Sequence, residues 1–505
     1  MTDRPTADAK SQRKADSSRA DSSGTGEPTT DSDLVADEPV GAGTFDFVVA
    51  ANRLPVARDS SGEWQLSPGG LVTAMSPVME GRDGAWIGWN GDVDADPEST
   101  KPFDHSGISL HPVPLSKQER LGYYEGFSNS TLWPLYHNGI LPTTFKRVWW
   151  ASYLKVNRRF AQWAVELAAP NAEIWIHDYH LQLMPAMVRE LRPDVSIGFF
   201  VHTPFPPSQL LMRLPWRDQI ARGLLGSDLL GFQTTTDARN FLTLAHRLAG
   251  LDEVVLHDDV VIFEYEGRDV NVGAHPISID YESVETMAAD PKMKQASSVF
   301  RAKLGNPTKI VLGVDRLDYT KGIDARLKAF GELLEEGELD AKEVVFVQVA
   351  TPSRDAVPGY ADARASIEQL VGQINGNSAP VGRAVVHYLH RTLPFEELVP
   401  LYLAADVMLV TPFEDGMNLV AKEYVASRLD NTGVLVLSEF AGTAEEFGDS
   451  AVICNPFDTA GLKRAIMTAL DMSHADGTER MKTMRAHLAG HTVHDWAARF
   501  LDQLG

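Results

Sequence analysis

Apolar residues in this chain gather into short runs, each followed by a polar loop and then by a segment with helical spacing. The first run, FDFVVAANRLPV, begins after Thr44 and has the unbroken apolar character of a strand that is buried on both faces. Similar runs recur in AEIWIHDYHLQLMPAMVREL, VSIGFFVHTPFPPSQLLMRL and DLLGFQTTTDARNFLTLAHRL. Strands that alternate with helices predict an α/β fold with a doubly wound parallel sheet.

A second series of such units follows a break near Pro276. It contains KIVLGVDRLDYTKG, EVVFVQVATPSR, AVVHYLHRTLPF, DVMLVTPFEDGMNLVAKEY and GVLVLSEFAG. We therefore expect two sheets that face each other, with ligands bound in a cleft beyond the carboxyl ends of the strands. The predicted divisions are a polar, disordered tail at 1–43, an N-terminal domain at 44–278, a C-terminal domain at 279–472 and a helical segment at 473–505 that folds back across the junction.

The charge balance narrows the ligands that the surface can attract. The chain has 505 residues and a formal net charge of −23, which repels nucleic acids and anionic membranes. No stretch approaches the roughly 20 apolar residues of a membrane-spanning helix, and the N-terminal segment lacks the apolar core of a secretory signal. We expect a cytoplasmic protein without nucleic-acid or membrane partners. Its single cysteine, Cys454, can form neither an internal disulfide nor a zinc site, and we expect it to be buried.

Two cations follow the first strand of the second series. In VDRLDYTKGID, Arg316 and Lys321 lie at the entrance of a predicted helix. A guanidinium, an ammonium and the free amides of a helix N-terminus suit a diphosphate. The alternative is structural: Arg316 pairs with Asp315 or Asp318, and Lys321 is solvated.

A second loop, in TPFEDGMNLVAKEY, combines carboxylates with a helix that starts near Met417 or Asn418. Asp415 can accept hydrogen bonds from sugar hydroxyls, and Glu423 can reach a vicinal diol such as a ribose. The alternative is that Asp415 caps the helix while Glu423 pairs with a basic residue on the surface.

Weaker signals are spread over other strand ends. Gly69 and Gly70 precede helical spacing and could admit a phosphate, although a turn explains them equally. Two guanidiniums, a phenol, an indole and a carboxylate together suit a phosphorylated sugar, and the chain offers such groups in Arg53, Arg354, Tyr124, Trp133 and Asp178. His202 could contact a sugar or serve only as a core residue. The acidic cluster Asp92, Asp94 and Asp96 follows no apolar strand, so we reject it as a metal site or a phosphatase loop.

These motifs, in this order, resemble those of the trehalose-6-phosphate synthases. The resemblance extends from about residue 46 to about 500 and rests mainly on VDRLDYTKG and TPFEDGMNLVAKEY. It implies a GT-B fold of two Rossmann-like domains and a retaining transfer of glucose from UDP-glucose or ADP-glucose to glucose 6-phosphate. It implies no cofactor and no metal, and by analogy a homotetramer.

Position by position, the resemblance assigns roles to the candidates. The acceptor residues are Arg53, Tyr124, Trp133, Asp178 and Arg354. Arg316, Lys321, His202 and Asp415 act in catalysis. The donor contacts Gly69, Gly70, Arg316, Lys321, Leu393, Asp415 and the run Leu419, Val420, Ala421, Lys422 and Glu423. In this run, the resemblance implies that the backbone amides bind the donor phosphate and that the Glu423 side chain binds the donor ribose.

One departure is visible: Glu414 stands where the family pattern TPLRDG has arginine, which reverses a charge beside the donor loop. Two other functions stay open. A related transferase with a different acceptor would not need Arg53 and Arg354 if that acceptor were neutral. A catalytically silent sensor of sugar phosphate would not need Arg316, Lys321, Asp415 and Glu423.

Overall fold

A computed structural model describes residues 43–58, 62–66, 72, 75, 78–79, 82–95, 100–250, 255–257, 260–354 and 358–505. The predicted tail at 1–43 lies outside this part of the chain except for Gly43. The candidates Gly69 and Gly70 also lie outside it, as does Asp96 of the acidic cluster.

The first half of the chain builds a ten-stranded sheet with the order β10-β11-β12-β9-β8-β7-β1-β4-β6-β5. Its central strands, from β12 to β6, are parallel, whereas antiparallel strands border both edges. The prediction did not include these antiparallel edges. The strands are β1(Phe45–Arg53), β4(Gly84–Trp89), β5(Phe103–His105), β6(Ile108–Pro112), β7(Ala168–His177), β8(Ser196–Phe200), β9(Leu229–Phe232), β10(Val255–His257), β11(Val260–Tyr265) and β12(Arg268–Ala274).

Helices cover this sheet and account for the continuous apolar runs, because both faces of its parallel strands are buried. One segment, η1, is a π-helix, in which the hydrogen bonds span five residues. The helices are α2(Lys117–Glu119), η1(Arg120–Leu132), α3(Trp133–Tyr136), α4(Arg147–Leu167), α5(Met184–Leu191), α6(Ser208–Leu211), α7(Arg217–Leu224) and α8(Thr235–Ala249). A short hairpin of β2(Val56–Arg58) and β3(Trp64–Leu66) stands apart from the sheet.

The second half builds a six-stranded parallel sheet with the order β15-β14-β13-β16-β17-β18. The chain turns from one side of β13 to the other between β15 and β16, so the carboxyl ends of β13 and β16 form a topological switch point, where open α/β sheets bind ligands. The strands are β13(Lys309–Arg316), β14(Val344–Thr351), β15(Val386–Leu389), β16(Val407–Val410), β17(Val434–Ser438) and β18(Val452–Cys454).

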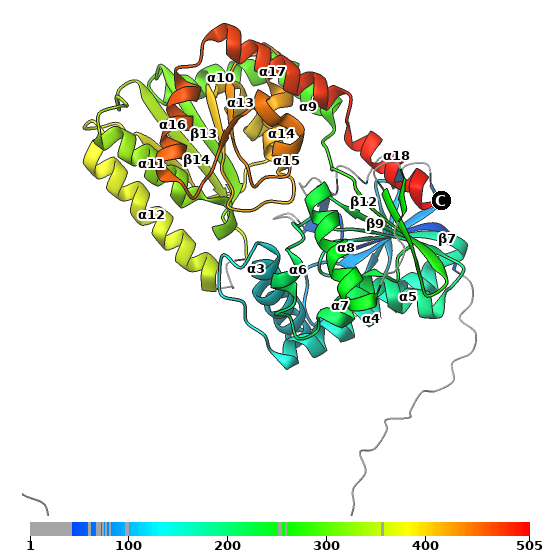
Figure 1. The fold of residues 1–505 in the computed structure, drawn as a ribbon. Coiled ribbons are helices and arrows are strands. Elements are labelled where there is room, and N and C mark those ends of the chain that lie inside the picture. Colours follow the sequence, from blue (N-terminus) through cyan, green and yellow to red (C-terminus); the bar gives the residue numbers. More distant parts are fainter. Residues whose placement is uncertain are drawn as a thin grey trace, which may run out of the picture. The chain divides into compact units, whose positions relative to one another are not determined.

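The remaining helices surround the second sheet, with one exception. They are α9(Tyr281–Ala289), α10(Pro291–Lys303), η2(Tyr319–Lys321), α11(Ile323–Glu335), α12(Pro358–Ser378), α13(Phe395–Ala404), α14(Leu419–Ser427), α15(Thr443–Phe447), η3(Gly448–Ser450), α16(Thr459–Leu470) and α17(His474–Ala489). The exception, α18(Val493–Leu504), contacts β8 and β9 of the first sheet, beside which it lies in Figure 1.

Two glycines leave space for α18 to pack against the first sheet. A Cβ atom at Gly198 of β8 or Gly231 of β9 would lie 2.7 Å from the Phe500 ring, which is fully buried and stacks on Trp175 with 4.5 Å between centroids. The last helix therefore completes the core of the first sheet.

The predicted limit at residue 278 falls between β12 and α9, and the domain limits stay predictions. Cys454 is buried, as expected, and its thiol is free. Among the described helices, none combines the length and the apolar character that crossing a bilayer requires.

Candidate active site

The loops after β13 and β16 meet at the switch point. After β13 the chain makes the single turn η2 and reaches Gly322, which has a φ of 59°. A Cβ atom there would lie 2.2 Å from the carbonyl oxygen of Thr411, so only glycine lets the two loops approach this closely. Across this contact, Lys321 Nζ lies 2.7 Å from Asp415 Oδ2. Lys321 is buried, which excludes the alternative that it is solvated.

Asp415 is held by a second donor that the sequence analysis missed. Asn418 Nδ2 donates to the same oxygen, Oδ2, at 2.9 Å. Asn418 Oδ1 meanwhile accepts from Ala421 N at 3.1 Å, so Asn418, and not Asp415, caps α14. Burial favours the neutral acid, but the ammonium of Lys321 and the two hydrogen bonds hold the pKa of Asp415 below its usual value. Asp415 therefore carries a negative charge and keeps Oδ1 for a further partner.

Arg316 ends β13 with an exposed side chain, and its Cζ lies 5.7 Å from the ring centroid of Trp133. The alternative paired it with Asp315 or Asp318, but Asp315 forms a buried ion pair with Arg326, and Asp318 lies 3.5 Å from Arg354 and accepts from the Tyr360 hydroxyl at 2.9 Å. The guanidinium of Arg316 is thus available at the carboxyl edge of the second sheet.

At the start of α14, the side chain of Lys422 is directed into the core. Lys422 is fully buried and binds Glu446 Oε1 at 2.6 Å and the Ile277 carbonyl at 2.8 Å, so only its backbone can serve a ligand. Glu423 accepts from the Tyr402 hydroxyl at 2.9 Å rather than from a surface base, and burial raises its pKa to about 7.

Further members of the predicted donor set are Leu419, Val420, Ala421 and Leu393. The first amides of a helix have no partner within it, and Leu419 and Val420 supply them here, whereas the amide of Ala421 is taken by Asn418. Leu393 is buried in the core of the second sheet.

Arg354 joins the two halves of the chain. It has a positive φ of 51°, and its Cζ lies over the Trp133 ring at 3.7 Å. Its nitrogens donate to the hydroxyls of Tyr360 at 2.6 Å and Tyr179 at 3.1 Å, and Asp318 lies 3.5 Å away. The predicted pair of Arg354 and Trp133 is therefore brought together, but one face of the indole is covered by the guanidinium.

Asp178 and Tyr124 lie near this cluster, since each interacts electrostatically with Arg354. Asp178 follows β7 with a positive φ of 74°, and burial raises its pKa to about 6. One of its oxygens accepts from His202 N at 3.3 Å, and the other lies 3.8 Å from His180 Nδ1. The Tyr124 ring stacks on that of His180 with 5.9 Å between centroids.

Arg53, at the end of β1, is linked to the same group through the rings of Trp89 and Tyr124. Its Cζ lies 4.8 Å from the ring centroid of Trp89, which meets Tyr124 edge-on at 5.8 Å. A Cβ atom at Gly91 would lie 2.5 Å from Arg53 Nη2, so this glycine makes room for the guanidinium.

The backbone of Gly416, next to Asp415, lies against the backbone of His202. A Cβ atom at Gly416 would lie 2.3 Å from the His202 carbonyl oxygen, so the loop after β16 is pressed against the loop after β8. Glu414 makes a further contact between the halves, since its Oε2 accepts from Asn138 Nδ2 at 2.5 Å. Burial raises the pKa of Glu414 to about 7.

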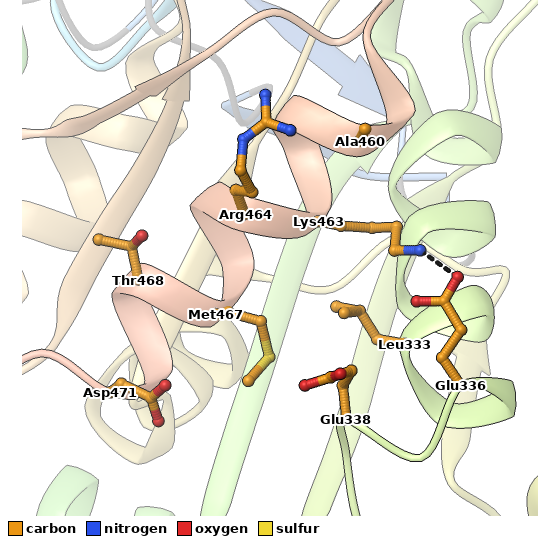
Figure 2. A pocket seen from close by; sticks show the side chains of 9 residues that line it. All are labelled: Leu333, Glu336, Glu338, Ala460, Lys463, Arg464, Met467, Thr468 and Asp471. Carbon is orange, nitrogen blue, oxygen red and sulfur yellow. Dashed lines mark hydrogen bonds and ion pairs between the residues drawn. The ribbon is translucent and has the colours of Figure 1, made fainter.

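A hollow of about 580 Å³ lies elsewhere, between α11 and α16. Figure 2 shows Lys463 reaching across it to Glu336. None of the predicted site residues lines it. The acidic cluster does not form a metal site: Asp94 Oδ1 accepts from Lys117 N at 3.1 Å, the Asp92 carbonyl accepts from Trp89 Nε1 at 2.5 Å, and the described part of the chain holds no group of three potential metal ligands.

Comparisons with known proteins give a consistent result. The profile of glycosyltransferase family 20 matches residues 46–505. The trehalose-6-phosphate synthase of Mycolicibacterium gilvum is 52% identical over 470 residues, which cover 91% of this chain and 93% of that protein. A UDP-forming synthase of this kind from Burkholderia xenovorans, solved with glucose 6-phosphate, is 34% identical with a TM-score of 0.84, over 91% of this chain and 99% of the other. The Escherichia coli protein bound to UDP-2-fluoro glucose is 33% identical with a TM-score of 0.82, over 91% and 98%.

Proposed function

This chain belongs to glycosyltransferase family 20, among the trehalose-6-phosphate synthases, and we propose that it transfers glucose from a nucleotide-glucose to glucose 6-phosphate. The products are α,α-trehalose 6-phosphate and a nucleoside diphosphate. The observation that carries the proposal is the meeting of Lys321 and Asp415 at the switch point of the second sheet, next to the cluster of Arg354 and Trp133. The ligands of the two solved relatives, glucose 6-phosphate and a UDP-sugar, support both substrates.

The donor diphosphate binds at the carboxyl edge of the second sheet in this proposal. Arg316 supplies an exposed guanidinium there. Lys321 adds an ammonium with three N–H donors, of which Asp415 uses one. The amides of Leu419 and Val420 point outward from the start of α14 and complete an anion site. Glu423 accepts from the ribose, and Leu393, Gly69 and Gly70 keep the donor roles that the family resemblance implies.

The acceptor lies on the side of the first sheet. Arg53 and Arg354 bind its phosphate, and Tyr124, Trp133 and Asp178 bind phosphate or sugar. Since Arg354 lies on one face of the Trp133 indole and the His137 ring lies 4.0 Å away between centroids, the sugar meets the edge of that indole. A second cationic site for a phosphorylated acceptor favours glucose 6-phosphate over a neutral glucan.

The chemistry follows from these positions. The acceptor hydroxyl attacks the anomeric carbon from the face that the diphosphate leaves, so the configuration is retained. The carbon–oxygen bond to the diphosphate breaks with its electron pair on the phosphate, and a phosphate oxygen takes the hydroxyl proton. Arg316 and Lys321 stabilise the charge as it develops, while Asp415 and His202 hold the transferred glucose.

The wider organisation is part of the same proposal. Two domains with a limit near residue 278 close over the substrates and exclude water, which would otherwise hydrolyse the donor. We further propose a cytoplasmic enzyme that assembles as a homo-oligomer, by analogy a tetramer.

The test is release of nucleoside diphosphate by the full chain, with UDP-glucose and ADP-glucose each supplied with and without glucose 6-phosphate. We expect release to require glucose 6-phosphate, and the faster donor names the base. Proton NMR of the product should give the coupling of an α,α linkage. Lys321→Ala should lose activity, whereas Lys463→Ala, which changes a lysine at the distant hollow, should not.

Two outcomes would contradict the proposal. Release with both donors only when a different acceptor is added would identify a transferase of another specificity. Binding of glucose 6-phosphate without turnover of either donor would identify a silent sensor.

A further inference from the structure

Two neighbouring histidines, His177 and His202, are in contact, and the proposed mechanism uses only His202. His177 ends β7 and is fully buried, whereas His202 follows β8 and is half-buried. His177 Nδ1 and His202 Nε2 lie 3.2 Å apart, within hydrogen-bond distance. The orientation of His202 toward a ligand is therefore coupled to His177.

Both rings are neutral, since burial lowers the pKa of His202 to about 3 and that of His177 well below its ordinary value. A hydrogen bond between two neutral imidazoles contains one proton. That proton belongs either to His177 Nδ1 or to His202 Nε2, and the two arrangements present opposite groups to the site.

The surroundings of His177 distinguish the two arrangements. Its Nε2 atom is buried and has no partner among the described residues. If His202 donated, this atom would carry a buried N–H without an acceptor, which is rarer in proteins than a buried acceptor without a donor. The adjacent ring, Trp175, lies 4.9 Å away between centroids and offers only a donor, its own unpartnered Nε1–H. His177 therefore carries its proton on Nδ1 and leaves Nε2 bare.

The consequence falls on His202. Its Nε2 accepts from His177, so its own proton is on Nδ1. His202 is only half-buried, and its Nδ1 atom, unlike Nε2 of His177, is not a buried atom without a partner. The backbone of His202 is fixed as well, by Asp178 Oδ1 at its N–H and by the close approach of Gly416 at its carbonyl.

We propose that His177 is a positioning residue that fixes His202 as the Nδ1–H tautomer, so that His202 presents a hydrogen-bond donor, and not a base, to a sugar hydroxyl oxygen. The identity of that ligand rests on the proposed function, whereas the tautomer does not. A donor at this position orients a hydroxyl through its lone pair and takes no proton in the reaction.

The decisive measurement is the tautomer of His202 in the full chain labelled with isotopic nitrogen in histidine. Long-range nitrogen–proton correlations distinguish a ring protonated on Nδ1 from one protonated on Nε2, and the spectrum of His202→Gln assigns the resonance. We expect Nδ1–H. A ring protonated on Nε2, or on both nitrogens, at neutral pH would overturn the proposal. This readout needs no substrate, so it stands even if no donor is turned over.

Variants at His177 test the positioning role. His177→Asn keeps an N–H donor near the position of Nδ1, so the tautomer of His202 and kcat/KM should be preserved within about threefold. His177→Phe removes the donor, so His202 should populate both tautomers and kcat/KM should fall about tenfold or more, as for the loss of one oriented hydrogen bond. His111→Phe is the control, since His111 is a buried histidine on β6 away from the site. An unchanged tautomer in folded His177→Phe would refute the role of His177.

Discussion

The contact between Gly416 and His202 offers the sharpest test of the site, because a single methyl group perturbs it. In Gly416→Ala the new Cβ would lie 2.3 Å from the His202 carbonyl oxygen and 3.1 Å from the Thr203 carbonyl carbon. Both neighbours are backbone atoms, so no side chain can rotate away.

The size of the effect follows from the distances. An ordinary contact of a Cβ atom is 3.4–4 Å, so the loop and the His202 segment must separate by about 1 Å, and misplacement on that scale costs about 100-fold in rate. Retreat of the loop is resisted on its other side, where a Cβ atom at Gly442 would already lie 2.0 Å from the Gly416 carbonyl oxygen. We therefore expect kcat/KM of Gly416→Ala to fall about 100-fold, equivalent to about 2.7 kcal/mol, because Asp415 and His202 no longer face the same substrate.

The assay is donor-dependent release of nucleoside diphosphate at saturating glucose 6-phosphate, with a thermal melt of each variant. Gly372→Ala is the matched control: Gly372 lies within α12, and a Cβ atom there meets nothing within 4 Å. It should keep full activity and gain about 0.5–1 kcal/mol in stability. Near-normal kcat/KM in folded Gly416→Ala would refute the reasoning, as would an equal loss in the control.

Three further results are expected. Arg316→Ala should lower kcat about 100- to 1,000-fold, as for the loss of one donor to a developing charge. The control Lys463→Ala should leave kcat unchanged. Equal losses of kcat in the two variants would contradict the role of Arg316 and point to a general effect of removing cations. Glu414 has a pKa of about 7 in the folded chain against an ordinary 4.5, so the folded state binds more protons between these values and stability declines as pH rises through this window. Glu414→Gln should remove that part of the decline in urea melts at pH ~5 and ~7.5, and an unchanged slope would contradict it. Phe500→Ala should lower the free energy of unfolding in urea by about 3–5 kcal/mol. Phe457 is 62% exposed, so Phe457→Ala should change that free energy by less than about 0.5 kcal/mol.

The fold was accessible from the sequence because its signals are local. Apolar strands that alternate with helices predicted two doubly wound parallel sheets, the family resemblance implied the GT-B fold, and the solved relatives confirm that fold. The rule that ligands bind beyond the carboxyl ends of parallel strands selected the loops that contain Lys321 and Asp415. Those loops meet because β13 and β16 are neighbours in the sheet.

The partners of the site residues were not accessible in the same way. Lys321 binds a carboxylate 94 positions away, and Arg354 lies on an indole from the other half of the chain, so reasoning from near neighbours did not reach these partners. Asn418 was missed although a signal existed, since asparagine is a preferred N-cap residue directly before a helix. For Lys422 no local signal distinguishes a backbone contact from a side chain directed into the core.

The packing of α18 on β8 and β9 has a consequence for folding during synthesis. The strands β8 and β9 are synthesised long before Phe500, because about 220 residues separate the end of β12 from that side chain. At roughly 5–20 residues per second on the ribosome, the apolar patch around Trp175, Gly198 and Gly231 waits about 10–45 s for its cover. During that interval the nascent chain exposes an apolar surface that α18 covers in the folded protein. Chaperone binding to the growing chain should therefore concentrate at this surface and end once α18 has packed on it.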